Sequence, residues 1–595
     1  MPSRFRGLFR GLAQVTPVEA TFNMDIWGHI FNQLALLGYH ETLASCARLS
    51  KAHAEPALRQ LYSQQFNPCS SWASRESKSL WLSIISNLYP TSHPYLTYVR
   101  RLDTHNLRAL LVNLDREKEL APFVRDLGYT EYRSMLPYLL PGWRPPLVAG
   151  CLLDRLVRFS NSQGLRVMLK ELTTRTWTEL VPAISSCPEL VSLSIDSISE
   201  LHGAADIINN LPKLRNLAFV EVNMEYTFEL AYLVSHLKPD QLRSFKCSLS
   251  GQLRVLEALA KQTELSELEL QFFFVPPSEL HVLTALTNLT SLTLKYNYTS
   301  TEDAKDEFRT WARDHRNTIA NWLMSCKSLK SLHVFRLPFL VPAIADALSH
   351  LRLDRLHIYG TAGHEGFYRA LKSQRLKYLF IGEWSRTHWL HEGKRRWLVL
   401  GAVCAMPCLR DLRLHTTFGL SNKQLERIAK HVKDLETISF HSSPGEDRAG
   451  VLRALEGFKH LTSLTVLGLT LFRARELMQW IELTRCHLRP GGFSLSLPSQ
   501  GISPWLFSDT NPELFFPLPG NMVREPSPEK FRKLLRFFRV CIRGDRGEIW
   551  KGNDYEAEEE RMFINLWGEV EGSTAALMIV DQYRSLTRDM GRQLA

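Results

Sequence analysis

A short apolar pattern that recurs through the middle of the chain limits what this sequence can fold into. Each occurrence reads Leu-x-x-Leu-x-Leu, with apolar substitutes, and the occurrences begin at Leu190, Leu214, Leu242, Leu265, Leu289, Leu329, Leu353, Leu376, Leu409, Leu435 and Leu461. All but two of the spacings lie within the roughly 20–29 residues of a repeating unit made of one strand and its return segment. The longer spacings of 40 and 33 residues indicate insertions at residues 296–321 and 382–400.

A unit of this size cannot bury its own apolar face, so successive units must stack and share one core. The residue three places before the starting Leu supports the register, because it is apolar or Cys in the repeats with Cys187, Leu211, Leu286, Cys326, Met406, Val432 and Phe458. The pattern resembles that of leucine-rich-repeat proteins. It predicts an α/β solenoid, with a parallel sheet on the concave face, helices on the convex face, and Cys187 and Cys326 in the core.

Three short helices are expected between residues 22 and 66. Asn23 or Asp25 is suited to cap the first helix, and Gly38 to end it. The stretch Met24-Asp25-Ile26-Trp27 … Leu43-Ala44-Ser45-Cys46-Ala47 … Ser50-Lys51-Ala52-His53 resembles the F-box-like segment of fungal proteins. That family opens with Leu-Pro where this chain has Met24-Asp25, and it usually carries Trp where this chain has His53. The alternative is an ordinary three-helix cap on the downstream domain.

An F-box-like module followed by leucine-rich repeats resembles the substrate receptors of Skp–cullin–F-box ubiquitin ligases. The resemblance implies a non-catalytic subunit whose module docks the Skp adaptor, and through it a cullin ligase, while the solenoid binds an unknown target protein. The residues expected to contact the adaptor are Met24, Ile26, Ile30, Leu34, Leu43 and Leu49. The alternative function is a leucine-rich-repeat scaffold that binds a protein or acidic ligand without any ligase partner.

Strand alternation predicts which side chains the concave face displays. Residues two, four and six places after each starting Leu point away from the core. Those of the early repeats include no aromatic residue or His, whereas the repeats from Leu329 onward display many. Aromatic residues and Arg commonly anchor interfaces. The predicted target-binding residues are therefore His333, Phe335, Arg355, His357, Tyr359, Tyr378, Phe380, Arg413 and His415.

Arg355 and Arg413 are suited to bind a carboxylate or phosphate. The insertion that carries Trp384, Arg386, Trp389 and residues 394–396 is expected to border this surface. The alternative is that these side chains pack on one another or under an insertion loop.

No motif points to catalysis, to a metal or to a cofactor. Gly360-x-x-Gly363-x-x-Gly366 lacks the spacing and the Lys-Ser/Thr pair of a phosphate-binding loop. Cys404-x-x-x-Cys408 lacks a second pair at zinc-finger spacing, and Cys404 lies in an apolar run. We therefore predict a protein that is not an enzyme and holds no cofactor.

The remaining segments complete the expected organisation. Residues 1–21 form a basic tail, for which a mitochondrial targeting helix is the alternative. The F-box-like module covers 22–66, a helical connector with a candidate opening repeat 67–164, the solenoid 165–487, and a Pro-rich connection with a helical C-terminal cap 488–595. Within that last segment, helices are expected at residues 529–542 and 556–570. The basic first helix suggests nucleic-acid binding as a further, less favoured alternative.

The cellular compartment is inferred from composition. The longest nearly uncharged apolar run, Leu398–Leu409, is too short to span a bilayer. Ten cysteines in 595 residues form no close-spaced framework, which indicates a reducing compartment. The predicted location is therefore the cytoplasm or the nucleus.

Overall fold

The computed structural model divides into two compact units, residues 1–214 and 215–595, and each is described by itself. The described residues are 24–36, 39–49, 51–63, 95–104, 158, 167–176, 184, 187–198, 205, 208, 211–222, 227–249, 253–273, 279–297, 302–360, 364–382, 392–415, 419–441, 448–467 and 494–496.

The first unit begins with the three expected helices, α2 (Met24–Leu36), α3 (His40–Ala47) and α4 (Lys51–Ser63). Their shared core contains Phe31 and Leu43, both fully buried. His53 of α4 meets the ring of Trp27 edge to face, with 4.8 Å between the ring centroids. His53 therefore takes part in the aromatic packing between α2 and α4, at the position where the F-box-like pattern has Trp.

The same unit contains helix α6 (Tyr95–Tyr98) and three parallel strands, β1 (Arg101–Asp103), β2 (Glu171–Thr176) and β3 (Ser192–Ile198). Leu102 pairs with Leu172, and Leu172 pairs with Leu193. β1 thus lies in the segment that holds the candidate opening repeat, and it has the register of the later repeats.

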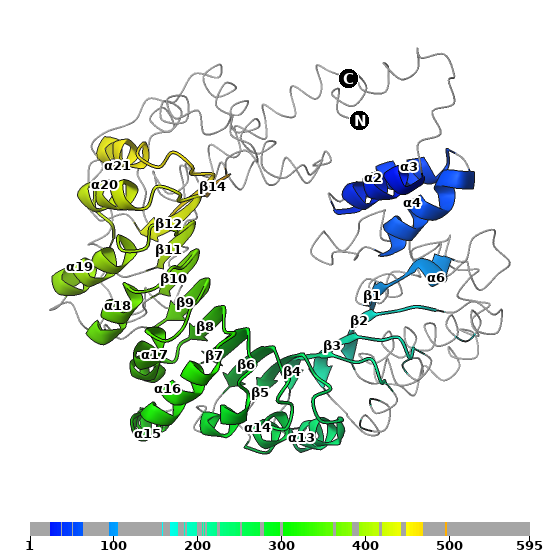
Figure 1. Ribbon diagram of the computed structural model, residues 1–595, viewed down its shortest axis with the longest axis horizontal. Coiled ribbons are helices and arrows are strands. Elements are labelled where there is room, and N and C mark those ends of the chain that lie inside the picture. The colour runs from blue at the N-terminus through cyan, green and yellow to red at the C-terminus, as the bar shows by residue number, and fades with distance from the viewer. Residues whose placement is uncertain are drawn as a thin grey trace, which may run out of the picture. The chain divides into compact units, whose positions relative to one another are not determined.

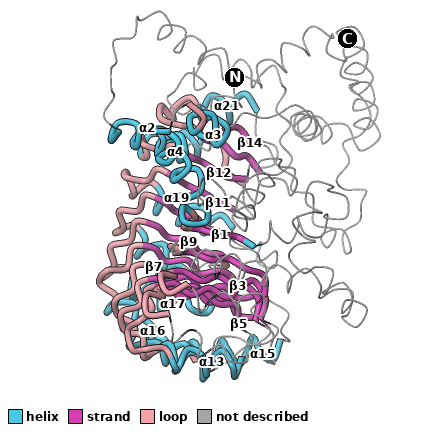
Figure 2. The backbone as a smooth tube through the Cα atoms, turned by 90° about the vertical axis from the view of Figure 1, so that its right-hand side faces the viewer, coloured by secondary structure: helices cyan, strands magenta, loops and turns pink. Residues whose placement is uncertain are grey.

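The second unit is a curved sheet in which all neighbouring strands are parallel and follow one another in chain order. In Figure 1 its strands line the inner side and its helices the outer side, and Figure 2 shows the strands stacked beside one another. The leucine-rich-repeat solenoid predicted from the repeat pattern is confirmed.

The strands of this unit are β4 (Asn216–Val222), β5 (Ser244–Leu249), β6 (Glu267–Phe273), β7 (Ser291–Asn297), β8 (Ser331–Phe335), β9 (Arg355–Tyr359), β10 (Tyr378–Gly382), β11 (Asp411–His415), β12 (Thr437–His441), β13 (Ser463–Leu467) and β14 (Ser494–Ser496). The return segments hold α13 (Thr227–His236), α14 (Leu253–Leu259), η7 (Leu280–Ala285), α15 (Glu302–Asp314), α16 (Arg316–Ser325), η8 (Pro338–Leu340), α17 (Val341–Leu348), α18 (Glu365–Leu371), α19 (Glu392–Val403), α20 (Asn422–His431) and α21 (Arg448–Leu455).

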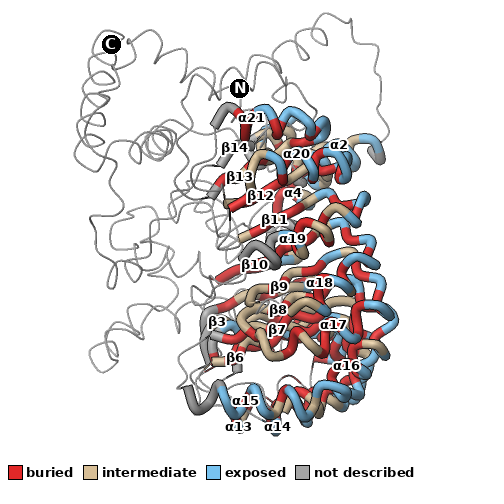
Figure 3. Tube along the Cα trace, turned by 90° about the vertical axis from the view of Figure 1, so that its left-hand side faces the viewer, coloured by how far each residue is buried: buried red, intermediate tan, exposed pale blue. Residues whose placement is uncertain are grey.

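The core lies between the sheet and these return segments. Leu332, Leu356 and Leu412 point inward from their strands, and each is at most 1% exposed. Figure 3 shows buried residues running along the strands. The position three places before the starting Leu is also buried in the seven repeats for which this was predicted. Cys326 is fully buried there, and burial raises the pKa of its thiol to about 11.

One feature adds to the expectations and a second corrects them. The insertion at residues 296–321 is largely helical, because it forms α15 and the first half of α16. The sheet also continues beyond residue 487, the expected end of the solenoid, since Leu495 of β14 pairs with Leu464 of β13.

Several predicted segments lie outside the described residues. They are the basic tail, the helices expected at 529–542 and 556–570, and the insertion residues Trp384, Arg386 and Trp389, together with the side chains of residues 394–396. Among the residues that are described, no helix combines the length and apolar character needed to cross a bilayer.

The shared core makes stability sensitive to single repeats. Leu356 is fully buried between the sheet and its helices, so Leu356→Ala should lower the free energy of unfolding by about 2–5 kcal/mol through lost burial and a cavity. Urea unfolding followed by circular dichroism measures the change. Arg352→Ala, at an exposed position just before β9, is the control and should change stability by less than about 0.5 kcal/mol. Equal midpoints for the two variants would contradict this packing.

A candidate protein-binding face on the concave sheet

The structure brings all nine predicted target-binding residues together on four adjacent strands, β8 to β11. The register aligns them in rows that cross the strands. One row runs through His333, His357, Phe380 and Arg413, and a second through Phe335, Tyr359, Gly382 and His415. A third row runs through Ser331, Arg355, Tyr378 and Asp411. We call the nine predicted residues the concave patch.

Within the rows, flat rings lie against one another. The ring centroids of His357 and Phe380 are 3.9 Å apart with 23° between their planes, and those of Phe335 and Tyr359 are 4.7 Å apart. Phe380 also meets His415 at 4.8 Å. Offset stacking of this kind stabilises beyond the burial of area alone. The alternative that these side chains pack on one another is therefore present in the structure. It leaves most of the rings half-buried, but Phe380 is only 8% exposed and, contrary to the prediction, is not accessible to a partner.

Gly382 makes room for this arrangement. A Cβ atom at this position would lie 2.1 Å from Cδ2 of Tyr359 and 2.9 Å from Cε1 of Phe380. The Tyr359 ring thus occupies the space that a side chain at residue 382 would need. Sequence reasoning did not single out Gly382, although it is the only Gly at the concave positions of β8–β12.

The two arginines of the concave patch differ in their surroundings. Arg413 donates from Nε and from a terminal nitrogen to the two carboxylate oxygens of Asp411, both at 3.0 Å, and its guanidinium lies 5.5 Å from the Tyr378 ring centroid. Arg413 is therefore already paired, which weakens the expectation that it binds a partner's anion. Arg355 is exposed, and no ion pair or hydrogen bond of its side chain is found among the described residues.

The histidines of the patch are held in the neutral form. Burial, followed by the charges of His333, Arg413, His415 and Lys295, lowers the pKa of His357 to about 4. Burial, His441 and Arg413 lower the pKa of His415 to about 4 as well. Nε2 of His357 has no hydrogen-bond partner among the described residues. At neutral pH these imidazoles therefore act as flat, uncharged rings.

The concave face of the preceding strands has a different character. Lys295 of β7 and Lys246 of β5 both pair with Glu269 of β6, the latter at 3.4 Å. Ser244 donates to Glu267 at 3.1 Å. The face thus changes from compensated charges on β5–β7 to rings on β8–β11, as the distribution of aromatic residues predicted.

The residues expected to contact the adaptor separate into two groups. Ile26 and Ile30 of α2 are 45% and 40% exposed, and Leu49 after α3 is 68% exposed. Leu34 is half-buried, whereas Leu43 is fully buried in the core of the three helices. Leu43 therefore stabilises the module and is not accessible to a partner. Met24 begins α2, but its side chain lies outside the described part.

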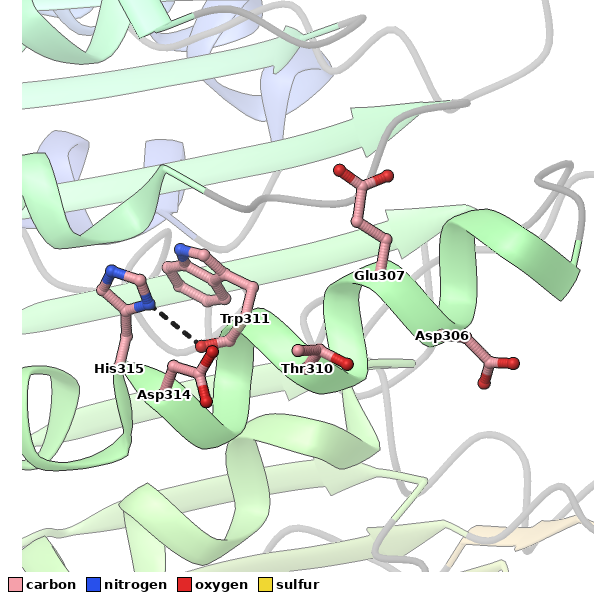
Figure 4. Close-up of a pocket in the computed structure, with 6 residues that line it drawn as sticks. All are labelled: Asp306, Glu307, Thr310, Trp311, Asp314 and His315. Carbon is pink, nitrogen blue, oxygen red and sulfur yellow. Dashed lines mark hydrogen bonds between the residues drawn. The ribbon is translucent and has the colours of Figure 1, made fainter.

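A shallow hollow on the convex side offers a second place where polar side chains gather. It is formed by α15 and the residue after it, and its lining consists of Asp306, Glu307, Thr310, Trp311, Asp314 and His315. Figure 4 shows Asp306 and Glu307 pointing away from the stacked pair of Trp311 and His315. The acids do not converge there, and among the described residues no group of three or more His, Cys, Asp or Glu side chains could hold a metal ion.

Comparison with known proteins gives matches among solved structures but none among family models or curated proteins. Solved structures that match include an internalin (inlF) from Listeria monocytogenes, with 16% identity over 52% of this chain and 81% of the other and a TM-score of 0.29. The Rad7 and Elc1 complex in yeast matches with 15% identity over 61% and 92% and a TM-score of 0.34. The TLR13–ssRNA13 complex matches with 13% identity over 50% and 54% and a TM-score of 0.23. At these TM-scores the similarities carry no information on function.

The close approach of Tyr359 to Gly382 can be tested by a double-mutant cycle. Gly382→Ala should destabilise the protein by about 1–3 kcal/mol, because the new methyl group overlaps the Tyr359 ring. In a Tyr359→Ala background the same change should cost much less, since the ring is gone. Chemical unfolding of the four proteins measures both values. An equal cost in both backgrounds would show that the ring does not lie over residue 382.

The neutral histidines make stability depend on pH in a defined window. The pKa of His357 is about 4 in the folded chain and about 6.5 when unfolded, so between these values only the unfolded chain takes up the proton. Stability should therefore fall as the pH drops from about 6.5 toward 4. His357→Phe keeps the ring and removes the proton site, and it should reduce the loss of Tm between pH 7.5 and pH 5.

Tyr378→Phe is the matched control for this prediction, because it changes a neighbouring ring without removing a group that titrates in this window. Thermal melts of the three proteins at the two pH values give the comparison. A His357→Phe protein whose Tm falls with acidification as steeply as that of the Tyr378→Phe protein would show that His357 is not held neutral.

Proposed function

We propose that the chain is the substrate-recognition subunit of a Skp–cullin–F-box ubiquitin ligase, that it binds a target protein on the concave patch, and that it catalyses no reaction itself. The observation that carries the proposal is the concave patch. Aromatic and imidazole rings of four adjacent strands lie half-exposed on a rigid sheet. Half-exposed aromatic residues and Arg are the residues that most often anchor protein interfaces.

The ligase part of the proposal rests on the N-terminal module. Its three helices carry the F-box-like residue pattern, and two apolar side chains one helical turn apart, Ile26 and Ile30, are left exposed on α2. Leu49 adds a third exposed apolar side chain after α3. An adaptor that covered these side chains would remove apolar surface from water, which favours association.

The proposed mechanism is proximity. The concave patch holds the target while the module holds the adaptor, so a lysine of the target stays near a conjugating enzyme that other subunits supply. Tethering raises the effective concentration of that lysine without any chemistry on this chain. The second candidate function, a scaffold without a ligase partner, is favoured by the departures from the F-box-like pattern at Met24-Asp25 and His53.

Co-expression with the Skp adaptor separates the two functions. The full chain should co-purify with the adaptor in a stoichiometric complex. The triple variant Ile26→Glu/Ile30→Glu/Leu49→Glu should lose the complex, because burying three carboxylates against an apolar partner is costly. Size-exclusion chromatography with quantified band ratios measures the stoichiometry.

Arg59→Glu is the matched control, since it places a carboxylate on an exposed position of α4 within the same module. It should leave the complex intact. Circular dichroism melts confirm that all variants are folded. If the folded wild-type chain forms no complex, or if the triple variant binds as well as Arg59→Glu, the scaffold function replaces the ligase function.

A further inference from the structure

The charges on the concave face of the second unit are almost all compensated. Lys246 and Lys295 share Glu269, and Arg413 is held by Asp411. Two side chains differ: Glu267 on β6 accepts from Ser244 but has no cationic partner among the described residues, and the exposed Arg355 has no carboxylate partner among them. With the histidines neutral, Arg355 and Arg413 of the concave patch and the adjacent Asp411 together carry one net positive charge.

An apolar shelf adjoins this charge. Arg355, His357 and Tyr359 follow one another on the same side of β9, with about 7 Å between successive side chains of a strand. His357 is stacked on Phe380 and Tyr359 on Phe335, so the shelf is wider than one strand. The guanidinium of Arg355 therefore stands at one edge of a flat aromatic surface, and that of Arg336 lies 5.1 Å from the Phe335 ring centroid.

We propose that the concave patch recognises an acidic segment of a partner protein, in which an Asp or Glu carboxylate binds Arg355 and an aromatic or aliphatic side chain lies on the shelf of His357 and Tyr359. In an extended segment, alternate side chains are also about 7 Å apart. The recognised feature is thus an acidic residue and an apolar residue separated by one position. This inference rests on the proposed function, because it names the chemistry of the target that the patch binds.

The charge balance favours a carboxylate over a phosphate group. Phosphorylated segments are usually bound by clusters of arginines, which match their charge of nearly −2. Of the two arginines of the concave patch, Arg355 alone has no carboxylate partner among the described residues, and the carboxylate of Asp411 lies in the same row, on the strand beyond that of Tyr378. A single carboxylate matches the single charge of Arg355 and is repelled less by Asp411.

Peptide selection with the full chain tests the proposal. A library of random dodecapeptides on phage is panned against the immobilised wild-type chain, and the strongest peptide is synthesised for fluorescence anisotropy. We expect selected peptides to be enriched in an acidic residue two positions from an aromatic or large aliphatic residue. Arg355→Glu should lower the affinity for the synthetic peptide by at least about tenfold, which is the effect expected from the loss of one charged hydrogen bond. Lys246 also lies on the concave face, in β5. Lys246→Glu is therefore the control and should leave the affinity for the peptide unchanged.

The outcomes distinguish this inference from the proposed function. Peptides that lose binding in a His357→Ala/Tyr359→Ala variant but show no acidic preference would overturn the inference and leave target capture by the patch intact. Peptides that bind this folded variant as tightly as the wild type, or a wild-type chain that selects none, would overturn both. A peptide with phosphoserine in place of its acidic residue should bind more weakly, and tighter binding would reassign the ligand to a phosphorylated segment.

Discussion

The register of the parallel sheet is the constraint on which the rest of the solenoid depends. In the repeats that start at Leu214 to Leu435, the carbonyl after the starting Leu accepts hydrogen bonds from two consecutive amides of the next repeat. The Lys330 carbonyl accepts from the amides of Asp354 and Arg355 at 2.8 and 2.9 Å, and the Asp354 carbonyl accepts from those of Lys377 and Tyr378 at 2.9 and 3.1 Å. Because each of these units repeats this step, equivalent residues stand beside one another. The lateral rows of side chains on the concave face are a direct result.

These rows explain why the rings of the concave patch stack in a regular arrangement. They also explain which polar group loses its hydrogen-bond partner as a result. Neighbouring rings at equivalent positions can stack only because no slip of register separates them, and Gly382 leaves the space that Tyr359 fills. The cost is a half-buried imidazole, His357, whose Nε2 finds no hydrogen-bond partner among the described residues. An interface whose side chains are already stacked loses less conformational freedom when a partner binds. The same packing that stabilises the sheet therefore suits the binding role proposed for the concave patch.

The features of the fold that depend on the period of the repeat could be predicted from the sequence. Leucine spacing located the strands and their outward side chains, and the slot before each strand placed Cys326 in the core. Contacts that depend on the choice of side-chain rotamer could not be predicted from the sequence. Arg413 pairs with Asp411 on its own strand and not with a partner, and Tyr359 turns over Gly382. Strand β14 was missed because Gly492 stands where the repeat pattern has its starting Leu.

The central claim is that one chain joins an adaptor to a target held on the concave patch, and ubiquitin transfer in a reconstituted ligase tests it most directly. The reporter is a lysine-bearing protein fused to a peptide that binds the patch. The account predicts transfer to this reporter with the wild-type chain, clearly less transfer with Arg355→Glu, and none with the module variant that does not bind the adaptor. Background-level transfer with a wild-type chain that binds both the adaptor and the reporter would contradict it.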